Sequence, residues 1–264
     1  MRVLDLPAGL LAWCIVVGAM LGAVMGSFLH CAAWRIARGE RFTSGRSHCP
    51  QCGHVLGVID LIPLFSWLFL RGHCRYCGAK VPIRYFLAEL FCAVVTVACL
   101  FRFDLTVLCL RNWLFFCCLF LLSLVDLEIQ EIPDGCLIAA AVIWLAALPF
   151  LWAGWADALL HVAAGLVFGA ALLGVSLVLD RFLKKESLGG GDVKLLAVIG
   201  LYLGFLPTLF SVILACILGL GQAFLSGKSR GAAFPFGPAL SAAALLMLFF
   251  GEPLAGWYLG LLFH

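Results

Sequence analysis

Four cysteines in this sequence have a spacing that can hold a metal ion. They form two C-x-x-C pairs separated by 21 residues: Cys49, Cys52, Cys74 and Cys77. Each pair can bring two thiolates to one ion, and two pairs complete a tetrahedral shell of four sulfurs. Zn²⁺ suits such a closed shell better than iron, and a shell without an open position is structural. The alternatives are two disulfides, or replacement of one cysteine by a nearby histidine: His48, His54 or His73.

Two acids stand beside long apolar runs. Asp126 follows "WLFFCCLFLLSLV", and Asp192 follows three glycines in "ESLGGGDVKLL". Ionisable groups at membrane depth are costly, which makes each a functional candidate. If the two carboxyl groups pack together they can share a proton, so that one activates a water and the other polarises a peptide carbonyl. The sequence thus allows aspartic protease chemistry.

The three glycines before Asp192 have an expected role in that chemistry. Gly189, Gly190 and Gly191 lack side chains, so an extended substrate backbone could approach the acid closely. They would also permit a positive φ just before the helix begins. The motif lacks the G-K-[ST] of a phosphate-binding loop and a preceding strand, so it is not a nucleotide fingerprint.

Other functions remain open on the residues alone. The acids could form a proton or ion relay, or the chain could be a non-catalytic assembly scaffold. Asp192 could simply favour the positive end of its helix. Asp134, which follows Pro133, is a rival to Asp126 and also fits an ordinary cap of the next helix.

The composition identifies a membrane protein. Hydrophobic residues make up 64% of the 264 residues and charged residues only 12%, with a mean hydropathy of +1.13. The basic residues are spread over loops rather than gathered on a strip with aromatics, so we expect no nucleic-acid partner. The first apolar run lacks a small-x-small cleavage site and is expected to stay as a membrane span.

The fold class predicted from these runs is an all-α polytopic membrane protein with about eight transmembrane helices and a small zinc-binding loop. The boundary between the sixth and seventh spans, at "GFLP" (204–207), is the least defined. The predicted spans are Leu10–Leu29, Phe86–Phe101, Trp113–Val125, Leu137–Trp152, Ala158–Leu179, Val193–Leu203, Thr208–Leu225 and Ala239–Phe250.

Three regions follow from this pattern: residues 1–33 as the first span, 34–85 as a cysteine-rich loop, and 86–264 as the membrane core. The loop carries eight of the 17 Lys and Arg residues, so the positive-inside rule places it in the cytoplasm. Fourteen of the 17 agree with one orientation, which puts both termini outside and both acids at the cytoplasmic membrane face.

Taken together, the motifs resemble those of the bacterial prepilin peptidases, the type IV leader peptidases, which are membrane aspartic proteases of the G-x-G-D type. The resemblance covers nearly the whole chain. It rests on "GSFLH" (26–30), the cysteine quartet with "IPLFSWL" and "RGHCRYCG", "RYFLAEL" (84–90), "DLEIQEIPD" (126–134), "GGGDVKLL" (189–196) and "PFGP" (235–238).

The resemblance implies an inner-membrane enzyme that cleaves the basic leader of prepilins or pseudopilins after a glycine, on the cytoplasmic side. It implies Asp126 and Asp192 as the catalytic acids, and N-methylation of the new N-terminus with S-adenosylmethionine. For methyl transfer it points to the cysteine-rich loop, where Gly72 is the one residue nominated. The substrates would build type IV pili, a type II secretion pseudopilus or a competence filament.

The chain departs from the family pattern at three positions. His30 stands where Asn is usual, Phe86 where Pro often follows "RY", and Leu188 where Met often precedes the glycines. None of the three is a catalytic acid or a cysteine of the quartet.

Overall fold

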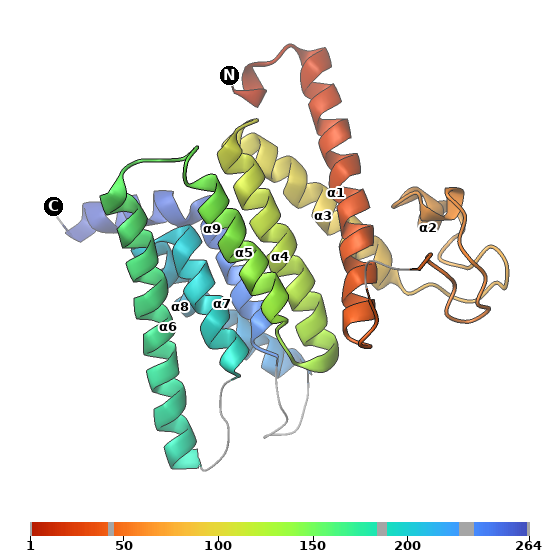
Figure 1. The fold of residues 1–264 in the computed structure, drawn as a ribbon. Helices are drawn as coiled ribbons and strands as arrows, with labels where there is room; N and C mark the ends of the chain where they lie inside the picture. Colours follow the sequence, from red (N-terminus) through yellow and green to blue (C-terminus); the bar gives the residue numbers. More distant parts are fainter. Residues whose placement is uncertain (1, 42–44, 184–188, 227–234, 263–264) are drawn as a thin grey trace. The chain divides into compact units, whose positions relative to one another are not determined.

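The computed structural model describes residues 2–41, 45–183, 189–226 and 235–262 (Figure 1). These residues form helices and two isolated β-bridges, without a β-strand. The elements in chain order are η1 (Val3–Asp5), α1 (Ala8–Ile36), η2 (Ile59–Leu61), α2 (Phe65–Phe69), α3 (Ile83–Phe103), α4 (Val107–Ile129), α5 (Asp134–Ala147), α6 (Trp155–Leu183), α7 (Gly190–Leu203), α8 (Phe205–Ser226) and α9 (Gly237–Leu262).

Each predicted span coincides with one of these helices, which confirms the all-α polytopic fold. Within the described residues, six helices are long and apolar enough to cross a membrane: α1, α3, α4, α6, α8 and α9. The other two, α5 and α7, have only 14 residues each. The fourth span was predicted five residues too long, because the helix gives way to a turn after Ala147. The sixth and seventh spans part at Gly204, where φ is +72°.

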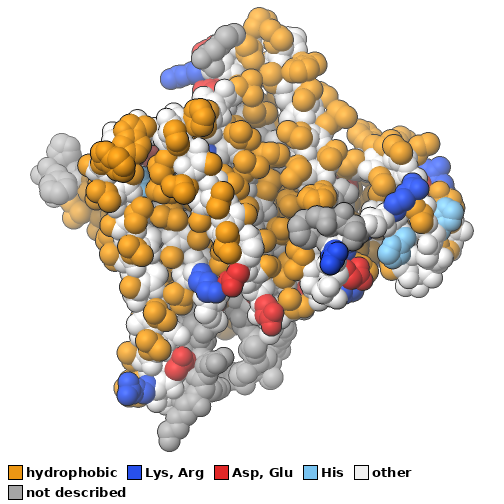
Figure 2. Space-filling view, viewed as in Figure 1, with side chains coloured by type: hydrophobic (Ala, Val, Ile, Leu, Met, Phe, Trp, Pro, Cys, Tyr) orange, Lys and Arg blue, Asp and Glu red, His pale blue; other side chains and the backbone are white. Residues whose placement is uncertain are grey.

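The outer surfaces of the long helices are apolar. Leu160, Leu177 and Phe224 are 66%, 61% and 83% exposed, respectively. Figure 2 shows hydrophobic side chains covering the helices on the face drawn, with few charged ones among them. Such a continuous apolar exterior is what lipid tails require and what a water-soluble protein avoids. The chain is therefore a multi-pass membrane protein.

The chain divides into two compact units, Met1–Trp113 and Leu114–His264, and the division falls within α4. In the N-terminal unit, α1 packs against α3 through small residues. A Cβ at Gly26 would lie 2.9 Å from the Ala88 carbonyl oxygen, so the two helix backbones are nearly in contact. The cysteine loop, residues 37–82, connects these two helices.

In the C-terminal unit, α7 is the central helix. It packs against α5, α6, α8 and α9. Its Tyr202 ring stacks on Phe115 of α4 with centroids 3.7 Å apart, and the Tyr202 hydroxyl donates to the Ala140 carbonyl of α5 at 2.8 Å. Gly200 lies against Gly165, which brings α6 close to α7. These contacts fix α7, which carries Asp192, against its neighbours.

Candidate active site and metal centre

Asp126 lies near the end of α4, three residues before its last residue, Ile129. It is 4% exposed, and its Oδ2 atom has no hydrogen-bond partner among the residues that the structure describes. An unpaired carboxylate oxygen in such a place carries a large desolvation cost. Sites that carry this cost are more often functional than structural.

Asp192 lies in the first turn of α7, where the free backbone N–H groups of the helix favour a negative charge. Its Oδ1 atom is also buried and makes no hydrogen bond within the described part of the chain. Asp126 and Asp192 are close enough to interact electrostatically. The end of α4 and the start of α7 therefore bring together two acids that are 66 positions apart in sequence.

Gly237 lies against Asp126, and Ile132 lies against Gly237 and Gly191. A Cβ at Gly237, the first residue of α9, would lie 2.6 Å from Oδ2 of Asp126 and 3.3 Å from Cδ1 of Ile132. Ile132 also touches Gly191, where a Cβ would meet its Cβ at 2.8 Å. The start of α9, the turn after α4 and the start of α7 thus meet beside the acids, and a side chain at 237 would displace the Asp126 carboxylate.

The glycine triplet does not use the backbone freedom that glycine offers. Gly189 has φ −69° as the residue before α7, and Gly190 and Gly191 are helical, so none of the three adopts the positive φ that the sequence permits. Space around the three also differs. A Cβ at Gly190 would meet nothing within 4 Å, one at Gly189 would make an ordinary contact with Asp192, and only Gly191 is crowded. The crowding comes from Ile132, a residue of the protein itself.

Asp134, the rival acid, lies in a different environment. Its side chain is 62% exposed and forms an ion pair with Lys194, with Nζ and Oδ1 2.7 Å apart. It is the first helical residue of α5, so the N-cap position belongs to Pro133 and not to Asp134. The capping role predicted for Asp134 is therefore wrong, because its carboxylate turns to the lysine. An exposed, paired carboxylate lacks the environment that distinguishes Asp126.

The cysteine quartet forms two matching knuckles. In the first, the Cys49 amide donates to the His54 carbonyl and the Gly53 amide to the Cys49 carbonyl. The second repeats this pattern with Cys74, Ala79 and Gly78. Both glycines have φ +70°, a conformation that glycine adopts without strain. Local chain geometry therefore presents two thiols from each knuckle.

The four sulfurs converge on one point. All lie within 4.8 Å of one another, and the Cys49 and Cys77 Sγ atoms are 3.9 Å apart. A tetrahedral zinc–thiolate shell with Zn–S bonds of about 2.3 Å needs sulfurs about 3.8 Å apart, so the cluster fits a metal ion. All four cysteines are free thiols, so the disulfide alternative is not formed. Among the described residues, no histidine contributes a ligand atom to this cluster.

The thiols have unequal pKa values. At Cys49 the Cys52 amide donates to the sulfur and, with weaker hydrogen bonds, outweighs burial and lowers the pKa to about 7. At Cys77 the Ala79 amide favours the thiolate, but burial and the other three thiols outweigh it and raise the pKa to about 11. A cation would relieve this competition, because all four groups could ionise together.

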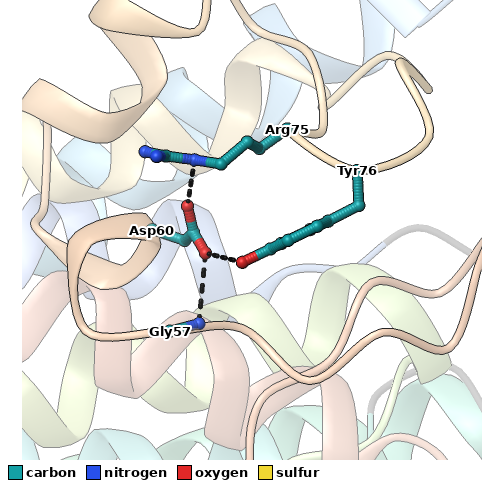
Figure 3. Close-up of polar contacts among 4 residues, drawn as sticks. All are labelled: Gly57, Asp60, Arg75 and Tyr76. Atoms are coloured by element: carbon teal, nitrogen blue, oxygen red, sulfur yellow. Dashed lines mark hydrogen bonds and ion pairs between the residues drawn. The ribbon is translucent and has the colours of Figure 1, made fainter.

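A buried acid braces the second knuckle (Figure 3). The side chain of Asp60 is 6% exposed; its Oδ2 accepts from the Gly57 amide at 3.1 Å and from the Tyr76 hydroxyl at 3.0 Å. Its Oδ1 pairs with Nε of Arg75 at 2.8 Å. Burial opposes the charge, but these three partners outweigh it and lower the pKa of Asp60. Arg75 and Tyr76 lie between the two cysteines of the knuckle, which Asp60 thereby holds in place.

Gly72, nominated for methyl transfer, precedes the second knuckle with φ +70°. A Cβ there would lie 2.9 Å from the Trp67 ring, so the glycine allows the indole to pack on the backbone.

Of the three departures from the family pattern, His30 packs edge-on against Tyr85 and Phe86 against Trp67, while Leu188 lies outside the described residues. Five charged residues also lie outside the described ranges: Lys184, Lys185, Glu186, Lys228 and Arg230.

No catalytic or binding role is predicted for Ile132, Gly237 or Lys194 from the sequence. Gly237 stands in "PFGP", which was noted as a motif only, and Ile132 stands in "EIPD". A glycine between two prolines within a motif was the available signal for Gly237. No local pattern could reveal their contacts, because these join the loop after α4 and the start of α5 to the starts of α7 and α9.

Known families match both parts of the chain. Residues 20–103 match the Bacterial Peptidase A24 N-terminal domain, and residues 113–224 match the Type IV leader peptidase family. The first segment contains the cysteine quartet and the second contains both acids. No solved structure matches the chain.

Similar proteins have one name in common, prepilin leader peptidase/N-methyltransferase. The protein from Bacillus subtilis is 30% identical over 91% of this chain and 96% of its own length. The protein from Aeromonas hydrophila is 34% identical over 81% of this chain and 74% of its own, and that from Dichelobacter nodosus is 36% identical over 83% and 80%. The chain belongs to the type IV leader peptidase family.

Proposed function

We propose that Asp126 and Asp192 are the catalytic dyad of a membrane aspartic endopeptidase that removes the leader peptide of prepilins. Family membership supports prepilin cleavage and N-methylation as the two reactions of this protein. The observation that carries the assignment of residues is the pair of buried, unpartnered carboxylate oxygens brought together by α4 and α7.

Two carboxyl groups at short range share one proton, because two adjacent negative charges in a poorly solvated site repel strongly. The ionised member takes a proton from a water molecule, which attacks the peptide carbonyl. The protonated member donates a hydrogen bond to the carbonyl oxygen, and the nitrogen leaves as an amine after taking up a proton. The products are a leader ending in a carboxylate and a pilin with a free amino terminus.

The position of the dyad suits a substrate with an apolar helix. Both acids lie at helix ends rather than at mid-span, so the junction of a polar leader and an apolar pilin segment can reach them. The positive-inside rule puts this end on the cytoplasmic side, as it does the basic cysteine loop. A glycine at the cleavage position would offer the least obstruction in a site bordered by Ile132 and Gly237.

We further propose that the quartet Cys49, Cys52, Cys74 and Cys77 binds Zn²⁺ as a structural ion. The sulfur spacing and the two knuckles support this ion, and four thiolates leave no position for catalysis. For the second reaction, S-adenosylmethionine supplies the methyl group. The filament system that the substrates build stays a prediction: type IV pili, a type II secretion pseudopilus or a competence filament.

The test is cleavage of a purified prepilin by the full-length enzyme and its variants. Asp126→Asn and Asp192→Asn should each abolish leader removal while the protein remains folded and membrane-inserted. Asp134→Asn is the matched control, because that acid is exposed and its ion pair contributes at most about 1 kcal/mol. Normal processing by either dyad variant, or loss of processing only in Asp134→Asn, would overturn the assignment.

A further inference from the structure

The cysteine loop exposes a series of large apolar side chains between its two knuckles. Within residues 58–69, seven such side chains are exposed, and Val58 and Phe69 are each 83% exposed. This series, the apolar face, comprises Val58, Ile59, Leu61, Ile62, Phe65, Leu68 and Phe69. So many exposed apolar side chains in one short segment mark an interaction site rather than a surface in contact with water.

One side of α2 is fixed within the loop, which leaves the apolar face on the outside. Trp67 Nε1 donates to the Val81 carbonyl at 3.3 Å, and the indole packs on Phe86 with ring centroids 5.1 Å apart. The rings of Phe65 and Phe69, one helical turn apart, stack with centroids 6.5 Å apart. The helix is therefore held to the start of α3 on one side and presents two phenyl rings on another.

Hydrogen bonds place α2 at the level of the membrane edge. The Leu64 amide donates to Oε2 of Glu89 in α3 at 2.7 Å, and the same carboxylate accepts from the Ser27 hydroxyl of α1. Ser27 lies nine residues before Ile36, the last residue of α1, which is about 14 Å along the helix axis. It also lies within the apolar run Leu10–Leu29. The short helix thus lies level with the apolar part of α1, not beyond the end of α1 (Figure 1).

The charges of the loop fit the same location. Between residues 41 and 82 the sequence contains one acid, Asp60, and its side chain is buried with three partners. Arg71 and Lys80 are exposed on this loop. Aromatic and aliphatic side chains beside cations match the boundary between acyl chains and anionic headgroups. The same cations would repel the basic leader expected of a prepilin, which argues against the substrate as the occupant of the apolar face.

We propose that the apolar face inserts into the interfacial region of the bilayer and holds the cysteine loop against the membrane. Phe65, Leu68 and Phe69 contact the acyl chains, and Arg71, the second residue after α2, contacts headgroup phosphates. Residues 58–70 thus lie in the membrane surface, although the positive-inside rule places the loop as a whole in the cytoplasm. This role depends on neither of the two proposed reactions.

The first test is photochemical cross-linking by the full-length enzyme in nanodiscs of phosphatidylethanolamine and phosphatidylglycerol. Phe69→p-benzoylphenylalanine places a photoreactive group on the apolar face. Arg46→p-benzoylphenylalanine is the matched control, because Arg46 is exposed on the same loop and its carbonyl oxygen lies 3.5 Å from Nη2 of Arg35. Arg35 is eight residues after Ser27, about 12 Å nearer the end of α1. Mass spectrometry should find about tenfold more phospholipid adduct at position 69 than at position 46.

Other occupants would give other adducts. Cross-linking of position 69 to added prepilin, or to a second copy of the enzyme, in place of phospholipid would overturn the proposal. Equal phospholipid yields at positions 69 and 46 would also overturn it, and so would the absence of any adduct at position 69. Melting temperature and prepilin cleavage report the fold of each labelled protein.

The second test needs no label. In nanodiscs, Phe69→Ser should speed hydrogen exchange of the amides of residues 64–70 about tenfold, because a segment that leaves the interface is exposed to water. Phe69→Leu is the matched variant that keeps an apolar side chain, and its exchange should stay within a few-fold of wild type. Wild-type exchange rates in Phe69→Ser, or equal increases in both variants, would contradict insertion of this side chain.

Discussion

Replacement of Gly237 by alanine tests the geometry of the dyad with a single carbon atom. The new Cβ would lie 2.6 Å from Oδ2 of Asp126, whereas ordinary contacts begin near 3.4 Å, so the two groups must separate by about 0.8 Å. The new Cβ cannot move toward Ile132 to relieve this contact, because it would already lie 3.3 Å from Cδ1 of Ile132. A displacement of about 1 Å at a catalytic group can cost about 10²-fold in rate. We therefore expect Gly237→Ala to lower kcat/KM for prepilin cleavage by about 10²-fold.

The assay is leader removal from a synthetic prepilin by detergent-solubilised enzyme, followed by gel mobility or mass. Gly256→Ala is the matched control, since it is on the same helix and its Cβ would meet nothing within 4 Å. Alanine is also the better helix former, so loss of α9 cannot explain a defect. Wild-type cleavage by Gly237→Ala would show that the carboxylate of Asp126 does not need its present position. An equal defect in Gly256→Ala would assign the effect to α9 as a whole.

Three further predictions follow from the contacts of Gly191 and of the cysteine quartet. Gly191→Ala should impair cleavage because its Cβ meets Ile132 at 2.8 Å, while Gly190→Ala should cleave nearly normally; equal rates in the two variants would contradict this internal crowding. Cys49→Ser should remove stoichiometric zinc from the purified protein, measured by elemental analysis, and metal-free wild type would contradict the quartet. Asp60→Asn should lower zinc affinity about tenfold in a chelator competition, because the second knuckle loses its brace; unchanged affinity would contradict that role.

The metal centre could be predicted from local patterns, because a C-x-x-C-G knuckle is built by consecutive residues. Its glycine has φ near +70°. The pairing of Asp126 with Asp192 was also within reach, because counting spans places the two helix ends at one membrane level. The positive φ that Gly189–Gly191 would permit is not used, since the lack of a side chain does not fix the backbone conformation. Gly191 alone of the three is crowded, by Ile132.

The contacts around the two acids could not be predicted from the sequence, because they join residues far apart in the chain. Gly237 reaches Asp126 from more than 100 residues away, and nothing local encodes that approach. Asp134 resembled a helix cap because it follows Pro133, yet its carboxylate pairs with Lys194 from another helix. Such long-range partners are set by how helices pack, which the order of apolar and polar residues constrains only loosely.

The two short helices give the surrounding lipid a part in the reaction. At 1.5 Å per residue, the 14 residues of α5 and of α7 extend about 21 Å, roughly 9 Å less than a hydrocarbon core of about 30 Å. The deficit must be met by local thinning of the bilayer or by backbone enclosed within the protein. Local thinning would bring the polar boundary closer to the dyad and shorten the path of water to the bond that is cleaved. Acyl-chain length thereby becomes a variable of this hydrolysis, alongside substrate and pH.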